Sequence, residues 1–112
     1  MKKTVFIVLF VLLVIFFLPA QASQSEISKM EKELTAFSVD LTKVENNRYK
    51  LDLQKEMMLD IFQMQYKNLS EFLNLAKKGD KDITDQSIRG MRLVLEQHHA
   101  LLKQMFEDIL KK

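Results

Sequence analysis

Apolar residues recur at alternating steps of three and four along most of the chain, and this spacing predicts α-helices. The first such stretch has a narrow apolar seam between charged and small polar residues, formed by Ile27, Met30, Leu34, Phe37, Leu41 and Val44. A second seam lies near the C-terminus and consists of Ile88, Met91, Leu95, His98, Leu102, Met105 and Ile109. The chain has only two glycines and one proline, too few for the regular turns of an all-β protein. We therefore expect an all-α protein.

The stretch between these seams, from Leu51 to Ala76, is apolar over most of its circumference, because its polar residues form only a stripe. A helix of this kind must be covered on more than one side, so the pattern predicts a central helix. Gly79 follows two lysines and is suited to the left-handed conformation that ends a helix. Thr84 and Ser87 predict the cap of the next helix. Gly90 lies inside that helix and predicts a close approach of another backbone there.

The joint at residues 45–48 contains no apolar residue and two asparagines, which favour a turn. The alternative is one helix from Ser25 to Lys78, whose 54 residues would span about 81 Å. Because globular helices are far shorter, we predict three helices, at about 25–45, 49–78 and 84–111. The expected fold is an antiparallel helical hairpin or a three-helix bundle, formed as one domain by residues 23–112.

The N-terminus has the three parts of a secretory signal peptide at residues 1–22. Two lysines precede a 15-residue apolar run over residues 4–18, and Pro19 breaks it. Ala20 and Ala22 then supply the small residues of a cleavage site before Ser23. As a helix the run would span about 22 Å, short of the roughly 30 Å hydrocarbon core. We therefore expect cleavage and a periplasmic or secreted mature chain, with an uncleaved membrane anchor as the alternative.

The net charge of +2 belongs to the signal, since two of the 17 basic residues are Lys2 and Lys3. All 15 acidic residues follow residue 22, so the mature chain is formally neutral. Neutrality and export together argue against nucleic acid as a partner. The absence of cysteine excludes disulfides and thiolate metal sites.

His98 and His99 are the first residues to consider for chemistry. Neighbouring helical residues point about 100° apart, so these two cannot hold one ion from the same face. In an antiparallel hairpin His98 would stand level with Met64, and thioether and imidazole ligands suit copper(I). The alternative is that Met64 and His98 only pack against neighbouring side chains, as methionine and histidine on helix seams commonly do. We expect no cofactor and, since no nucleophile has a base beside it, no enzyme.

The remaining feature is the excess of apolar residues in the middle segment, which one narrow helix does not obviously cover. We expect a protein–protein contact there, formed by Met57, Leu59, Ile61, Met64 and Tyr66. The expected partner is a second copy of the chain or a larger envelope protein, in an accessory or chaperone-like role. If the signal is not cleaved, the alternative is a helical accessory protein that the signal anchors to the membrane.

Overall fold

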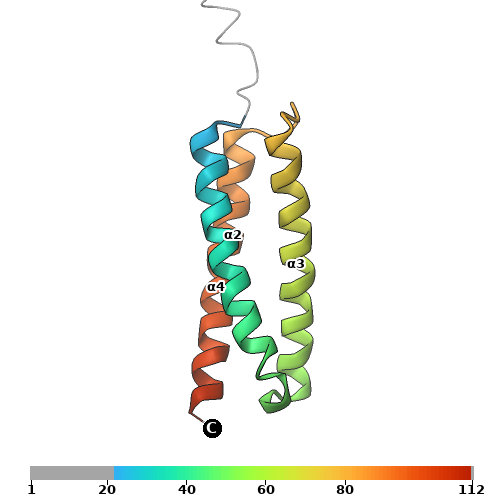
Figure 1. The fold of residues 1–112 in the computed structure, drawn as a ribbon, viewed down its shortest axis with the longest axis vertical. Coiled ribbons are helices and arrows are strands. Elements are labelled where there is room, and N and C mark those ends of the chain that lie inside the picture. The colour runs from blue at the N-terminus through green and yellow to red at the C-terminus, as the bar shows by residue number, and fades with distance from the viewer. Residues whose placement is uncertain (1–21, 112) are drawn as a thin grey trace, which may run out of the picture.

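The computed structural model describes residues 22–111 and places three α-helices side by side in an up-and-down bundle (Figure 1). Helix α2 spans Gln24–Glu45, α3 spans Leu53–Lys77 and α4 spans Asp85–Leu110, with a short 3-10 turn at Arg48–Lys50 before α3. The expectation of three helices is confirmed, and the chain turns after Glu45 rather than continuing as one long helix. Residues 1–21 of the signal predicted at residues 1–22 lie outside the described residues. Within the described part, no helix combines the length and apolar content that crossing a bilayer requires.

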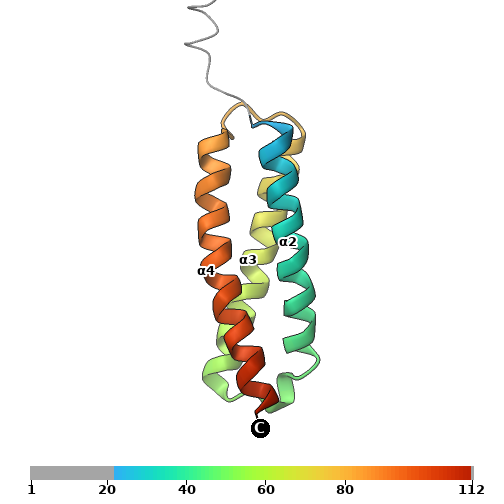
Figure 2. The same cartoon turned by 90° about the vertical axis from the view of Figure 1, so that its left-hand side faces the viewer.

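Helix α2 packs along both other helices, whereas α3 and α4 touch each other much less. Turned by 90°, the bundle shows α2 and α4 in front of α3 (Figure 2). Every member of the first predicted seam is buried, and these side chains meet the buried faces of α3 and α4 in one core. The prediction that the middle segment forms the central helix is therefore wrong. The reason is that α3 buries a single face, containing Leu59, Phe62, Leu69, Leu73 and Ala76, and leaves its opposite apolar face uncovered.

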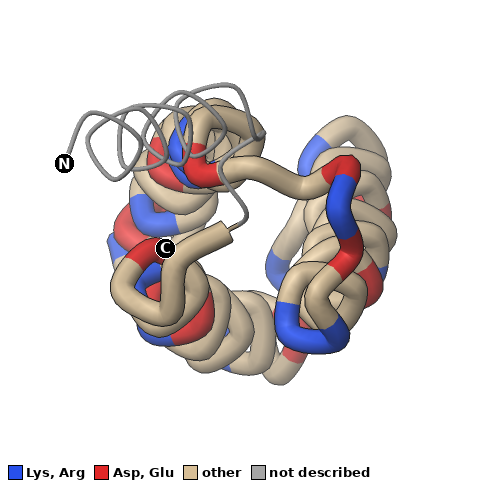
Figure 3. The backbone as a smooth tube through the Cα atoms, turned by 90° about the horizontal axis from the view of Figure 1, so that it is seen from above, with Lys and Arg blue, Asp and Glu red and all other residues tan. Residues whose placement is uncertain are grey.

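Charged residues of both signs are interspersed along the three helices when the bundle is seen from above (Figure 3). Several of them join α2 to its neighbours. Lys77 of α3 pairs with Glu31 of α2 at 2.8 Å, and Arg48 bridges Glu45 and Asp60 at 2.8 and 2.9 Å. The hydrogen bond from Arg48 lowers the pKa of Glu45 below its ordinary value. Because these pairs are largely exposed to solvent, each contributes little to the stability of the fold.

Local sequence explains where the helices begin and end. Ser23 caps α2, and Asp52 caps α3 by accepting from the Lys55 N–H at 2.9 Å. This cap starts α3 at Leu53, four residues later than the predicted position 49. Thr84 and Ser87 form the predicted reciprocal cap of α4.

Gly79 ends α3 in the left-handed conformation predicted for it, with φ of +83°. The N–H groups of Gly79 and Asp80 donate to the carbonyls of Ala76 and Leu75 at 3.1 and 3.2 Å. This is the Schellman arrangement, which satisfies the last carbonyls of a helix. Gly90, in contrast, has nothing within 4 Å of where its Cβ would stand, so the predicted close backbone approach is wrong.

The two glycines should therefore respond to alanine in opposite directions. Gly79→Ala is expected to lower the free energy of unfolding by about 1–2 kcal/mol, because an L side chain resists the left-handed conformation. Gly90→Ala is expected to raise it by about 0.5–1 kcal/mol, because alanine favours a helix interior and meets open space. Urea unfolding followed by circular dichroism measures both. If both variants changed the free energy of unfolding in the same direction, the different roles given to Gly79 and Gly90 would be wrong.

Candidate functional site

The side of α3 that faces away from the core carries five exposed apolar side chains, which we call the α3 outer stripe. Their exposed fractions are 73% for Leu53, 58% for Met57, 58% for Ile61, 63% for Met64 and 46% for Leu75. Their spacing places them on one side of the helix, opposite its buried face. Asn68 and Glu71 are exposed at intervening positions of the same side, so the stripe is interrupted by polar groups.

The structure divides the predicted contact residues between two faces. Met57, Ile61 and Met64 lie on the α3 outer stripe. Leu59 is fully buried, and it belongs to the core rather than to any accessible surface. Tyr66 is half-buried and packs against the core from the α2 side. The prediction rested on the number of apolar residues in the segment and did not distinguish its two faces. Leu59 and Tyr66 are seven residues apart, which places both on the face that packs against α2.

Two hollows flank Tyr66 in the groove between α2 and α3. One, of about 400 Å³, is lined by Ser38, Leu41, Thr42, Glu45, Gln63 and Tyr66. The other, of about 160 Å³, is lined by Glu31, Leu34, Thr35, Tyr66, Ser70, Leu73 and Asn74. The carboxylates in both hollows pair with cations or amides, Glu45 with Arg48 and Gln63, and Glu31 with Lys77. This arrangement presents neither a nucleophile with a base nor a converging set of metal ligands.

The two histidines of α4 diverge around a pair of core phenylalanines. His98 Nδ1 contacts Gln65 Oε1 of α3, and His99 Nε2 contacts Asp40 Oδ2 of α2 at 2.5 Å. The His98 ring lies 5.6 Å from the ring of Phe62, and the His99 ring lies 5.6 Å from that of Phe37. Each imidazole therefore caps one edge of the aromatic core and bonds to a different helix.

Met64 and His98, the residues considered for copper(I), face different surroundings. Met64 is mostly exposed on the α3 outer stripe, while His98 is half-buried against Phe62 and Gln65. Among residues 22–111 no three or more histidine, aspartate or glutamate side chains gather as metal ligands. Copper binding by Met64 and His98 stays a prediction. Sequence periodicity did not indicate Asp40 or Gln65, because their roles depend on how the helices are placed against one another.

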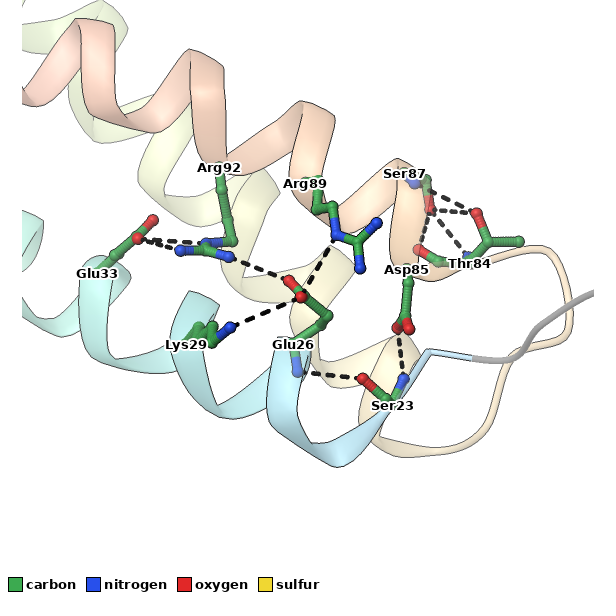
Figure 4. A network of polar contacts seen from close by, with 9 residues as sticks. All are labelled: Ser23, Glu26, Lys29, Glu33, Thr84, Asp85, Ser87, Arg89 and Arg92. Carbon is green, nitrogen blue, oxygen red and sulfur yellow. Dashed lines mark hydrogen bonds and ion pairs between the residues drawn. The ribbon is translucent and has the colours of Figure 1, made fainter.

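Glu26, Arg92, Glu33 and Arg89 form a network of ion pairs between α2 and α4 (Figure 4). Arg92 lies 2.7 Å from Glu33 and 3.0 Å from Glu26, whose side chain is only 8% exposed. Hydrogen bonding to Glu33 raises the pKa of Arg92 above its ordinary value, and Glu26 adds to the shift. The network links α2 to α4 around the buried Glu26 carboxylate, while one oxygen of Glu33, Oε2, is buried without a hydrogen-bond partner.

Two of the three predicted cleavage residues, Ala22 and Ser23, lie at the start of the bundle. Ala20 falls outside the described residues, Ala22 packs against the core, and Ser23 caps α2. No model of a known protein family matches the chain, and neither curated proteins nor solved structures yielded a similar protein.

Proposed function

We propose that this chain is an exported, non-enzymatic helical protein that acts by helix-to-helix contact, and that its first partner is a second copy of itself. The observation that carries the proposal is the α3 outer stripe, in which five large apolar side chains are each about half exposed or more. Export is supported by the basic, apolar and small-residue segments of residues 1–22. Binding is favoured over catalysis because the stripe is mainly apolar, and the carboxylates of the neighbouring hollows, Glu45 and Glu31, are paired with Arg48, Gln63 and Lys77.

The magnitude of the hydrophobic effect favours a partner that brings an apolar surface of its own. Burying the exposed parts of the five side chains would contribute roughly 5–9 kcal/mol, at about 1.5–3 kcal/mol for each complete side chain. Association costs about 4–15 kcal/mol or more in lost translational and rotational freedom. A single stripe that is buried against a polar surface would therefore bind with little net free energy. A homodimer related by a twofold axis buries the stripe twice and brings the gain to roughly 9–18 kcal/mol.

Asn68 and Glu71 limit the strength of this contact. Both are exposed among the apolar residues of the same side, and pairing two stripes would partly desolvate them. A polar residue in a helix seam lowers stability while it fixes the register of the two helices. The polar interruptions therefore favour a reversible dimer, which suits a surface that also accepts an apolar helix of another envelope protein.

Charge introduced into the stripe is the direct test. Ile61→Lys and Met64→Lys in the exported protein are each expected to weaken self-association by about thirtyfold or more, because a lysine would have to be desolvated at the centre of the contact. Sedimentation velocity over a wide range of concentrations measures the dissociation constant. Leu93→Lys is the matched control, since Leu93 is 61% exposed on α4 and stands apart from the stripe. A strictly monomeric wild-type protein, or equal weakening by the control, would overturn the proposal.

A further inference from the structure

The N-termini of α2 and α4 meet at the same end of the bundle (Figure 1), and Ser23 connects them. Its backbone N–H donates to Asp85 Oδ1 of α4 at 2.6 Å, across 62 positions of sequence. Its hydroxyl accepts from the Glu26 N–H at 3.3 Å and so caps α2 (Figure 4). Ser23 is thus held by two contacts, one within its own helix and one to the first residue of α4.

The donor in this contact is the Ser23 nitrogen, and the predicted cleavage after Ala22 would convert this amide nitrogen into a free amine. We propose that cleavage after Ala22 turns the Ser23 nitrogen into a charged α-ammonium group, and that Asp85 binds this group and fastens the start of α2 to α4. Asp85 then serves as the docking residue for the mature N-terminus. The inference rests on the proposed export and is independent of the proposed self-association.

The chemical change is a peptide hydrolysis by a signal peptidase. Water breaks the bond between the Ala22 carbonyl carbon and the Ser23 nitrogen, adding its hydroxyl to the carbon and a proton to the nitrogen. At neutral pH the new amine binds a further proton, and the new Ala22 carboxylic acid releases one. The signal leaves with the carboxylate, and the bundle gains one positive charge on the nitrogen that lies beside Asp85 in the uncleaved chain.

The charges around Ser23 identify Asp85 as the acceptor. Glu26, a second carboxylate at this end, is already paired with Arg92, Arg89 and Lys29. Asp85 forms no ion pair with any lysine or arginine in the described range 22–111. Two helix N-termini meet here, and their dipoles repel a cation. An unpaired carboxylate in contact with the ammonium offsets that repulsion.

The geometry also sets the order of events. A signal peptidase binds its cleavage site as an extended segment, but in the folded chain Ala22 packs against the core and Ser23 caps α2. Cleavage therefore requires this segment to be extended and away from the docked position that it has in the folded, uncleaved chain. The ion pair belongs to the mature protein alone and contributes stability only after processing.

The test compares two exported proteins made from full-length precursors. The first is the wild type. In the second, one alanine is inserted between Ala22 and Ser23, which preserves the Ala20 and Ala22 cleavage residues but leaves Ser23 with an amide nitrogen after cleavage. Asp85→Asn is then introduced into each. We expect Asp85→Asn to raise the unfolding equilibrium constant about five- to tenfold more in the wild type than in the insertion variant, because the wild type loses an ion pair whereas the insertion variant loses a hydrogen bond from a neutral amide.

A second measurement uses pH and needs no change at Asp85. Free α-amino groups titrate near about pH 8, and pairing with a carboxylate raises the pKa of such a group in the folded state. The stabilisation should therefore be fully present at pH 7 and lost as the pH rises beyond about 8. The insertion variant should lack this loss, although Glu26, Lys29, Arg89 and Arg92 surround the site in both proteins.

The outcomes are distinguishable. Mass spectrometry of the exported wild type should show a chain that begins at Ser23; any other start, or a retained signal, overturns the inference and the cleavage together. A chain that begins at Ser23 but in which Asp85→Asn acts equally in both proteins, or whose pH profile matches that of the insertion variant, overturns the docking role alone. Neither result depends on whether the α3 outer stripe forms a dimer.

Discussion

Replacing Phe37 with alanine is expected to lower the free energy of unfolding by about 3–5 kcal/mol, the range for removing a buried aromatic ring. Phe37 is fully buried on α2 and meets the other two helices through aromatic contacts. Its ring lies 6.2 Å from that of Phe62 on α3 and 5.6 Å from that of His99 on α4, both in edge-on geometry. Its removal would open a cavity where all three helices join.

The loss is large compared with the total stability of a small domain, which is about 5–15 kcal/mol. Urea unfolding at low temperature, followed by circular dichroism, measures it. Phe37→Leu is the graded control and should cost roughly 1–2 kcal/mol, because leucine fills part of the space. It also keeps the prediction testable if the alanine variant does not fold. Val39→Ala, on the exposed side of α2, should change stability by less than about 0.5 kcal/mol. A Phe37→Ala loss as small as that of Val39→Ala would contradict the role of this ring.

The α2 seam and the cap residues Gly79 and Thr84 were predictable from sequence because both depend on local spacing. Phe37 and Leu41 are buried where the periodicity placed them, and Gly79 ends α3 as its position indicated. A three-and-four pattern indicates which residues share a face, and a cap depends on residues within one turn. The start of α3 was predicted four residues too early, since the Asp52 cap and the 3-10 turn before it compete with a helical continuation.

The candidate surface was predicted only in part, because apolar content does not indicate which side of a helix its neighbours cover. Ile61 and Met64 face outward while Leu59 lies in the core, although all three are apolar and close in sequence. The polar contacts between helices were missed for a related reason. Asp40 meets His99 across 59 positions, and such pairs depend on the rotation and height of one helix against another, which periodicity does not encode.

Replacing Arg92 with methionine is expected to lower the free energy of unfolding by about 2–4 kcal/mol. The change keeps the apolar stem but removes the cation between Glu26 and Glu33, leaving two carboxylates near each other at the α2–α4 contact. Breaking a fully buried ion pair in this way costs about 3–5 kcal/mol. The expected loss is smaller because the side chains of Arg92 and Glu33 are 20% and 27% exposed, so water screens part of the repulsion.

Two companion variants separate charge from packing in the same unfolding experiment. Arg89→Met should cost less than about 0.5 kcal/mol, because Arg89 is 64% exposed and its closest approach to Glu26 is 3.4 Å. Arg92→Met combined with Glu33→Gln should recover part of the loss, since removing one carboxylate relieves the repulsion. If Arg92→Met and Arg89→Met cost the same, or if the double variant is no more stable than Arg92→Met alone, the network does not hold α2 to α4 through its charges. The stability at this end of the bundle would then come from the apolar contacts beneath it, among them Ile27 and Ile88.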